Sequence, residues 1–262
     1  MLKGKIAIVS GAAQGLGEAF ARRLAHEGAT VLAFDVQDKI KDVATKIAAE
    51  TGSKVVGMKA DVSKRADVEK VVAAAADLGG IDILVNNAGT WKKTPVDTSW
   101  DQAVADWDFI MDTNFKGVLM LTRASVPHMK ARGGDIVNIS TYYVMPARSD
   151  GTNQPDTDLY NASKWALNGF TDSWAKALEE FNIRVNALCM GATDTPMLRG
   201  LFPDKQLPAD MASVVMKPEQ IAQQMIDLFK DGRTGENIGA WVGYPVELGP
   251  RKAAHKRISG VA

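Results

Sequence analysis

The chain has 262 residues, of which 46% are hydrophobic and 24% are charged, as in an ordinary folded globular protein. Its 31 basic and 31 acidic side chains balance, so its charge gives no reason to expect nucleic acid as a partner. One cysteine excludes an internal disulfide, and the three histidines lie too far apart to predict a metal site.

The N-terminal apolar run at residues 6–9 is too short for the core of a signal peptide. No stretch approaches the ~20 apolar residues that a membrane span needs. We therefore expect a cytoplasmic protein without a membrane partner.

Short apolar runs alternate with amphipathic segments along the chain. Strands are predicted at 6–9, 30–34, 55–58, 81–85, 136–139, 183–188 and 239–243, and the first helices at 18–26, 38–50 and 66–78. Strands without polar alternation are buried on both faces, and their alternation with helices is typical of a parallel sheet. No linker or repeat interrupts the pattern. The prediction is an α/β fold with a Rossmann-type doubly wound parallel sheet, forming one catalytic domain over residues 1–262.

Two irregular segments follow strands, where an open parallel sheet binds its ligands. Residues 145–158 are polar, and we expect 148–154 to rim the substrate mouth. Residues 191–216 contain three prolines among apolar side chains. The alternatives for this second segment are a solvated connection and a substrate lid. We favour a lid because four of its side chains are poorly suited to solvent: Met197, Leu198, Leu201 and Phe202.

A glycine-rich loop links the first strand to the first helix. Gly11, Gly15 and Gly17 form a GxxxGxG pattern around Gln14 and Leu16. Such glycines permit a tight turn and a close approach of the backbone to a pyrophosphate, and the helix start offers N–H groups to it. The loop predicts a dinucleotide cofactor.

Asp35 ends the second predicted strand, 18 residues after the last glycine of the loop. A carboxylate at this place accepts hydrogen bonds from ribose hydroxyls and repels a 2′-phosphate. The alternative is a helix cap, for which Asp38 is better placed. The sequence therefore favours NAD over NADP.

Tyr160 and Lys164 lie four residues apart at the start of a predicted helix, and so on one face of it. An ammonium beside a phenol lowers the phenol's pKa from about 10 toward neutrality, which suits proton transfer to and from an alcohol. None of the other three tyrosines has a lysine four residues later.

The chain resembles the classical short-chain dehydrogenases/reductases over almost its whole length. The matching pieces, in chain order, are the GxxxGxG loop, Asp61–Val62, Asn86-Asn87-Ala88-Gly89, Asn114, Ser140, the YxxxK motif at Tyr160 and Lys164, and Thr195 after Gly191. Two features depart from the family pattern. Met190 stands where a proline is usual, and 20 residues separate Ser140 from Tyr160, more than the usual interval.

The resemblance implies a role for each matching residue. Tyr160 would transfer the proton, while Lys164 would lower its pKa and bind the nicotinamide ribose. Ser140 would bond the substrate oxygen, and Asn114 would hold a water, although Asn114 could instead bend a helix. The remaining cofactor contacts would come from Asp61 and Val62 at the adenine, from Asn87, Ala88 and Gly89 along the cofactor, and from Gly191, Thr193 and Thr195 near the carboxamide. Asn86 would tie strands together, and Thr195 could cap the lid helix.

We therefore expect an NAD(H)-dependent oxidoreductase acting on a secondary alcohol or ketone, with a non-catalytic dinucleotide-binding regulator as the alternative. No GxSxG motif supports a serine hydrolase. Candidates for an apolar pocket that suits a cyclic, aromatic or terpenoid substrate are Trp91, Tyr142, Tyr143, Met145, Met197, Leu198 and Phe202, which could equally be core or subunit contacts. Family members commonly form homotetramers, and aromatic side chains on the flanking helices predict a homotetramer or homodimer: Trp107, Phe109, Met111, Phe170, Trp174 and Leu178.

Overall fold

The computed structural model describes residues 1–145 and 155–252, and the predicted mouth segment 148–154 lies outside them. Seven parallel strands form one sheet in the order β3-β2-β1-β4-β5-β6-β7. Their bounds are β1 Ile6–Ser10, β2 Thr30–Asp35, β3 Val55–Lys59, β4 Ile83–Asn86, β5 Gly134–Thr141, β6 Ile183–Met190 and β7 Asn237–Ala240. All five residues of β1 are buried, as expected for a central strand that is covered on both faces.

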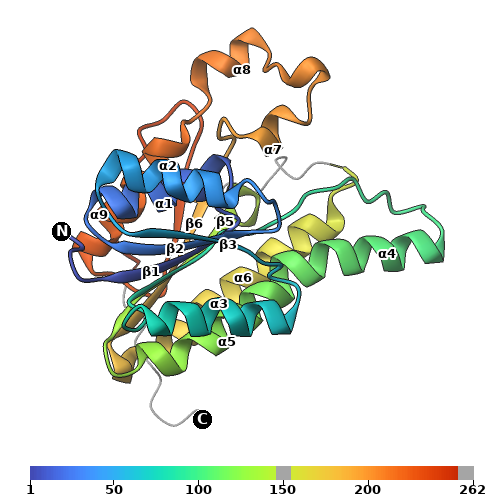
Figure 1. Cartoon of the computed structure of the whole chain (residues 1–262). Coiled ribbons are helices and arrows are strands. Elements are labelled where there is room, and N and C mark those ends of the chain that lie inside the picture. Colours follow the sequence, from blue (N-terminus) through green and yellow to red (C-terminus); the bar gives the residue numbers. More distant parts are fainter. Residues whose placement is uncertain (146–154, 253–262) are drawn as a thin grey trace.

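Helices cover both faces of this sheet (Figure 1). One layer holds α1 (Gly15–His26), α2 (Ile40–Thr51) and α9 (Pro218–Asp231), and the other holds α3 (Arg65–Asp77), α5 (Gly117–Met129) and α6 (Asp158–Ala177). A separate core fills the space under each layer. The predicted doubly wound α/β fold in a single domain is confirmed.

Three further helices extend beyond the two layers. The helix α4 (Trp100–Met111) runs through a π-helical turn, Asp112–Lys116, into α5. The short helices α7 (Pro196–Arg199) and α8 (Ala209–Val214) stand above one end of the sheet, at the top of Figure 1. Single 3-10 turns lie at Tyr142–Val144, Glu179–Phe181 and Pro203–Lys205.

The strand order reverses between β1 and β4, which pair directly. A chain that winds outward in both directions leaves a crevice beyond the carboxyl ends of these two strands, where ligands bind in open α/β sheets. The glycine loop follows β1, and Asn87 follows β4. The fold therefore brings two of the predicted motifs to the same edge.

Some predicted boundaries differ from the structure. Asp38 does not cap α2: this helix starts at Ile40 after Lys39, and the Asp38 carboxylate pairs with Lys59, 3.0 Å from its Nζ. The last strand is Asn237–Ala240 rather than 239–243, because the chain turns after it and Gly243 adopts a left-handed φ of 79°.

None of the helices formed by residues 1–145 and 155–252 combines the length and apolar character needed to span a bilayer.

Candidate active site

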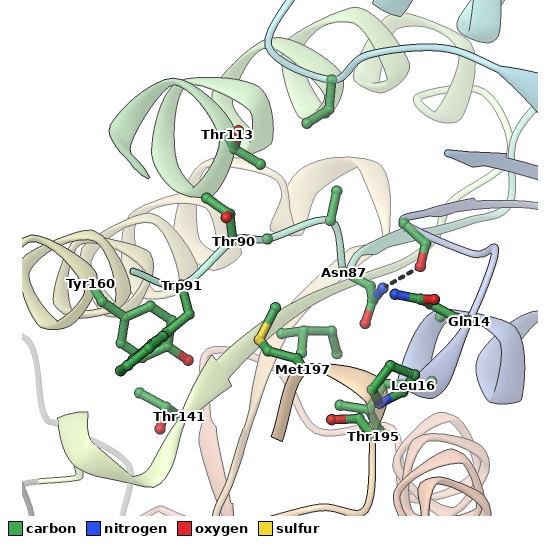
Figure 2. Close-up of a pocket in the computed structure, with 18 of the residues that line it drawn as sticks. Gln14, Leu16, Asn87, Thr90, Trp91, Thr113, Thr141, Tyr160, Thr195 and Met197 are labelled. Atoms are coloured by element: carbon green, nitrogen blue, oxygen red, sulfur yellow. Dashed lines mark hydrogen bonds between the residues drawn. The ribbon is translucent and has the colours of Figure 1, made fainter. Parts of the chain in front are cut away.

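A cavity of about 740 Å³ opens at the carboxyl ends of the central strands (Figure 2). It is lined by the loops after β1, β2, β3, β4, β5 and β6 together with the start of α6. Every predicted site residue except Asn114 contributes to its wall. Segments from the whole length of the chain thus meet at one pocket, as the switch-point position predicts.

The glycine loop forms the deep end of this pocket. Gly11 and Gly15 have left-handed φ values of 64° and 60°, which side chains rarely adopt. A Cβ on Gly17 would lie 2.1 Å from the Gly11 carbonyl oxygen, so only glycine lets α1 approach the loop. The helix α1 has 12 residues, and its first turn lines the cavity. No side chain caps this turn, so its N–H groups are available to a ligand there. This cradle fits the pyrophosphate of a dinucleotide.

Asp35 stands beside the loop at the end of β2. Its carboxylate is buried and accepts hydrogen bonds from the backbone N–H groups of Ala13 and Gln37, each at 3.0 Å. Both oxygens keep a free lone pair for a ribose hydroxyl. Lys39 lies nearby, and its Nζ donates to the Gln14 side chain at 2.6 Å. The loop region thus carries one carboxylate and one exposed ammonium.

The segment after β4 is tied to the glycine loop. The Asn87 amide donates to the carbonyl oxygens of Ser10 and Gly11 at 2.9 and 3.1 Å, and a dashed line in Figure 2 marks one bond of this side chain. The Ser10 hydroxyl accepts from the N–H groups of Asn87 and Ala88. These bonds fix the two sides of the crevice relative to each other. The Asn86 side chain donates to Asn138 on β5 at 2.9 Å, which confirms its predicted role in tying strands together.

Asp61 and Val62 form the wall beyond β3. The Asp61 carboxylate accepts from the backbone N–H and the hydroxyl of Ser63 at 2.9 and 2.7 Å. Val62 packs so closely on Gly117 that a Cβ there would lie 2.8 Å from it. Both residues lie on the cavity wall where an adenine is expected.

Tyr160 and Lys164 project from the first turns of α6 into the cavity. The helix begins at Asp158, so Tyr160 lies within its first turn. The Lys164 Nζ donates to the Ile139 carbonyl oxygen at 2.9 Å and lies 5.8 Å from the centre of the Tyr160 ring. The two groups share a helix face, as the spacing predicts.

The ionisation of this pair differs from the expectation. Burial raises the pKa of Tyr160 to about 12, the neighbouring Tyr143 phenol adds to the rise, and a hydrogen bond with Thr141 opposes it. Burial also lowers the pKa of Lys164 to about 8. The predicted lowering of the phenol's pKa by Lys164 does not occur here, because desolvation dominates and the ammonium is directed at Ile139.

Thr141 is the hydroxyl residue that faces the Tyr160 phenol. Its side chain hydrogen-bonds the phenol and favours its ionised form, and the two lie together in Figure 2. Neighbouring residues of a strand point to opposite faces, so Ser140 is directed elsewhere. Its Oγ lies 3.5 Å from the Lys164 carbonyl oxygen and hydrogen-bonds the buried Cys189 thiol. The sequence prediction named Ser140 and not Thr141. Choosing Thr141 would have shortened the unusually long interval to Tyr160 by one residue.

Asn114 is fully buried behind the cavity wall, within the π-helical turn. Its Oδ1 accepts from the Thr90 N–H at 2.7 Å, and its Nδ2 donates to the Thr90 carbonyl at 2.9 Å and to Ser163 at 3.2 Å. These bonds hold the loop after β4 against α6. A lone pair of Oδ1 is left for the predicted water, and Asn114 lies in the π-helical turn between α4 and α5.

The segment after β6 closes the opposite side of the cavity. Gly191 packs on Tyr142, where a Cβ would lie 3.3 Å from the ring, and Thr193 donates to the Gly191 carbonyl at 3.1 Å. Thr195 caps α7 by accepting from the Leu198 N–H at 3.2 Å, the alternative that the sequence left open. A Cβ added to Gly15 would lie 3.4 Å from the Thr195 methyl carbon, so the two loops are in contact here.

The mouth of the cavity is apolar and aromatic. Of the predicted pocket residues, Met145 and Phe202 lie outside the wall: Met145 packs on the small core under β6, and Leu201 lines the cavity in place of Phe202. Among the described lining residues Lys164 is the sole cation, whereas Asp108 and Asp112 add negative charge near the mouth. The apolar wall consists of Trp91, Phe109, Tyr142, Tyr143, Met197, Leu198 and Leu201.

Within residues 1–145 and 155–252, no group of three or more His, Cys, Asp or Glu side chains could hold a metal ion.

Comparisons with known proteins agree with this geometry. Residues 5–206 match the family model described as short chain dehydrogenase. A 3-oxoacyl-[acyl-carrier-protein] reductase of Thermotoga maritima is 36% identical over 247 residues, covering 91% of this chain and 96% of its own. The oxidoreductase UcpA of Salmonella typhimurium is 38% identical over 216 residues, covering 82% of this chain and 78% of its own.

A solved structure is similar over the whole fold. It is the 3-ketoacyl-(acyl-carrier-protein) reductase of Brucella melitensis in complex with NADH, with a TM-score of 0.78 and 31% identity. The match covers 93% of this chain and 99% of the reductase.

Proposed function

Because this chain belongs to the short-chain dehydrogenase family, we propose that it is an NAD(H)-dependent alcohol dehydrogenase or carbonyl reductase for secondary alcohols and ketones. The observation that carries the proposal is the Tyr160 phenol, set between the Thr141 hydroxyl and the Lys164 side chain in a cavity with a dinucleotide cradle. The apolar wall supports a cyclic, aromatic or terpenoid substrate.

NAD, when bound, would accept the hydride of an alcohol at its nicotinamide C4 or, in its reduced form, return it to a ketone. The chain would hold it with Gly11, Gly15 and Gly17 at the pyrophosphate and with Asp35 at the adenosine ribose. The lid that we propose at residues 191–216 would cover the other end through α7, whose Met197 and Leu198 reach the cavity.

The chain's own contribution to the chemistry is proton transfer and orientation. The Tyr160 phenol would donate a proton to a developing alkoxide, or accept one from an alcohol as its phenolate. Thr141 would hydrogen-bond the same substrate oxygen and fix its position. Lys164, with a pKa lowered to about 8, is still mostly an ammonium at neutral pH and would bind the nicotinamide ribose. The role expected for Ser140 stays a prediction, but the geometry favours Thr141 for it.

The direct test is turnover of a panel of cyclic and aromatic secondary alcohols by the purified protein with NAD. We expect reduced nicotinamide to form with at least one of them. Dinucleotide binding without turnover of any alcohol or ketone would instead support the non-catalytic regulator.

Cofactor preference tests the role of Asp35. We expect kcat/KM to favour NAD over NADP by about tenfold or more, because a buried carboxylate repels the additional phosphate. Asp35→Asn removes the charge and keeps the size of the side chain, with an acceptor oxygen for one of the two N–H groups of Ala13 and Gln37, so it should narrow this gap. Asp38→Asn is the matched control, since Asp38 is exposed and pairs with Lys59. Equal use of both cofactors by the wild type would contradict the assignment.

We also propose a homotetramer or homodimer. Along α4, the side chains of Trp100, Val104 and Trp107 are 87%, 57% and 52% exposed and follow one face of the helix. An apolar face of this kind is typical of an interface between subunits. Light scattering at micromolar concentration should give at least twice the mass of one chain, and Trp107→Glu should lower it. A monomeric wild type would rule this proposal out.

A further inference from the structure

The proposed lid has a narrow base. Its chain leaves the end of β6 and returns to the same place, where Thr193 and Met216 form a parallel bridge. The Asp194 N–H donates to the Met216 carbonyl oxygen at 2.8 Å, and the Met216 N–H donates to the Ala192 carbonyl oxygen at 3.2 Å. Met216 is buried in the core that it shares with α9, so this base is fixed to the rest of the fold.

The lid above this base has little packing of its own. Every residue from 194 to 214 is described by the structure, and none of them is buried. The lid projects from the rest of the fold in Figure 1, with α8 farthest out. Its first helix nevertheless lies on the cofactor cradle, where a Cβ on Gly15 would be 3.3 Å from the Pro196 ring. Since little side-chain burial holds α7 there, its placement depends on polar contacts.

Asp194 supplies these polar contacts. One of its carboxylate oxygens accepts from the Arg199 Nε at 2.6 Å, and the other accepts from the Arg199 Nη2 at 3.1 Å. The second oxygen also accepts from the Lys217 Nζ at 3.0 Å. Arg199 belongs to α7, whereas Lys217 directly precedes α9, so one carboxylate joins the lid helix to both sides of the base. We call Asp194, Arg199 and Lys217 the lid clamp.

The lid clamp has the character of a strong ion pair. The Arg199 guanidinium and then the Lys217 ammonium lower the pKa of Asp194, while burial opposes them, so the carboxylate is ionised at neutral pH. The Asp194 side chain is only 15% exposed. A bidentate bond to a shielded carboxylate is stronger than an ordinary surface ion pair, because its geometry is fixed and water competes less.

We propose that Asp194 is a positioning residue of the active site, which holds α7 over the bound cofactor through the lid clamp. This inference rests on the proposed function. The proton-transfer groups stand on other elements, Tyr160 on α6 and Thr141 on β5. The clamp therefore contributes to binding and not to the chemical step. The lid side chains that it brings to the cavity are Thr195, Pro196, Met197, Leu198 and Leu201.

The variant Asp194→Asn removes the charge of the lid clamp and keeps the size of the side chain. Losing two ion pairs should raise the Kd of NAD, read by titration calorimetry, and the KM of an accepted alcohol by about three- to tenfold. We expect kcat to stay within about twofold of wild type, since Tyr160 and Thr141 are untouched. Hydrogen exchange of residues 195–202, read by mass spectrometry, should become faster by about the same factor.

Three further variants separate the clamp from a general effect. Lys217→Gln removes only one of the two partners and should give a smaller change in the same direction. Asp194→Glu keeps the charge and should recover part of the NAD affinity. Asp227→Asn is the matched control, because Asp227 forms an exposed pair with Lys230 on α9, at 3.6 Å and outside the cavity wall. It should change neither the exchange of the lid nor the NAD affinity.

A general structural role for Asp194 would lower the melting temperature and kcat together with the affinity. That result, or an unchanged lid exchange or NAD affinity in Asp194→Asn, would overturn the inference. Neither of these two measurements needs turnover. A failure of the proposed function would show separately, as NAD binding by the wild type without oxidation of any alcohol.

Discussion

Replacing Tyr160 by phenylalanine is expected to lower kcat for every accepted alcohol by about a hundredfold or more. The ring keeps its place in the wall of the cavity, and only the hydroxyl that transfers the proton is lost. NAD affinity, measured by titration calorimetry, should stay within about threefold of wild type, because the glycine loop and Asp35 are untouched.

Tyr244→Phe provides the matched control. Tyr244 is 58% exposed and does not line the cavity, so losing its hydroxyl should leave kcat unchanged. If Tyr160→Phe retained activity within a few-fold of wild type, proton transfer by this phenol would be ruled out.

The raised pKa of the Tyr160 phenol predicts how kcat/KM for oxidation and for reduction depends on pH. Burial raises the pKa of Tyr160 to about 12 in the free protein, so the phenolate that oxidation needs is scarce at neutral pH. The kcat/KM for oxidation should rise between about pH 7 and pH 10, whereas that for reduction, which uses the neutral phenol, should not rise.

Removing the Thr141 hydroxyl is expected to have the second-largest effect. Thr141→Val keeps the shape of the side chain and should lower kcat/KM by about ten- to a hundredfold, because the substrate oxygen loses an oriented donor. Thr141→Ser should restore most of the activity. Ser140→Ala should stay within about threefold of wild type, since the Ser140 hydroxyl faces the Lys164 carbonyl and Cys189.

These three variants separate the two hydroxyl residues. If Ser140→Ala lost activity and Thr141→Val did not, Ser140 would have the role that the family resemblance implies. The assignment of Thr141 as the residue that hydrogen-bonds the substrate oxygen would then be wrong. Circular dichroism melts would show whether a loss of activity comes from unfolding.

The sheet could be predicted because its strands carry a local signal. Runs such as residues 6–9 are apolar on both faces, and that pattern is typical of a covered parallel strand. The glycine loop could be predicted equally well. Gly11 is required by its left-handed backbone conformation, and Gly17 by the close packing of α1 on the loop.

Features that depend on tertiary contacts were harder to predict. The helix α2 starts at Ile40 and not at Asp38, whose exposed carboxylate pairs with Lys59, a residue distant in sequence. Ser140 and Thr141 are adjacent hydroxyl residues, and only the folded geometry of β5 against α6 decides which one meets the Tyr160 phenol.

The ionisation of the site was predicted in the wrong direction for a similar reason. Helix spacing shows that Tyr160 and Lys164 share a face, but it does not show how deeply they are buried. Desolvation depends on every segment that encloses the cavity, and here it outweighs the effect of the neighbouring charge.

Transfer of a deuterium label tests the central claim most directly. Cyclohexanol, or another accepted secondary alcohol, would carry deuterium on its carbinol carbon and be oxidised with NAD by the purified protein. We expect the deuterium to appear at C4 of the nicotinamide ring, as read by NMR of the recovered cofactor, and Tyr160→Phe to form the labelled cofactor at least about a hundredfold more slowly. Reduced cofactor without the label, or no reduction of NAD by any alcohol of the panel, would contradict it.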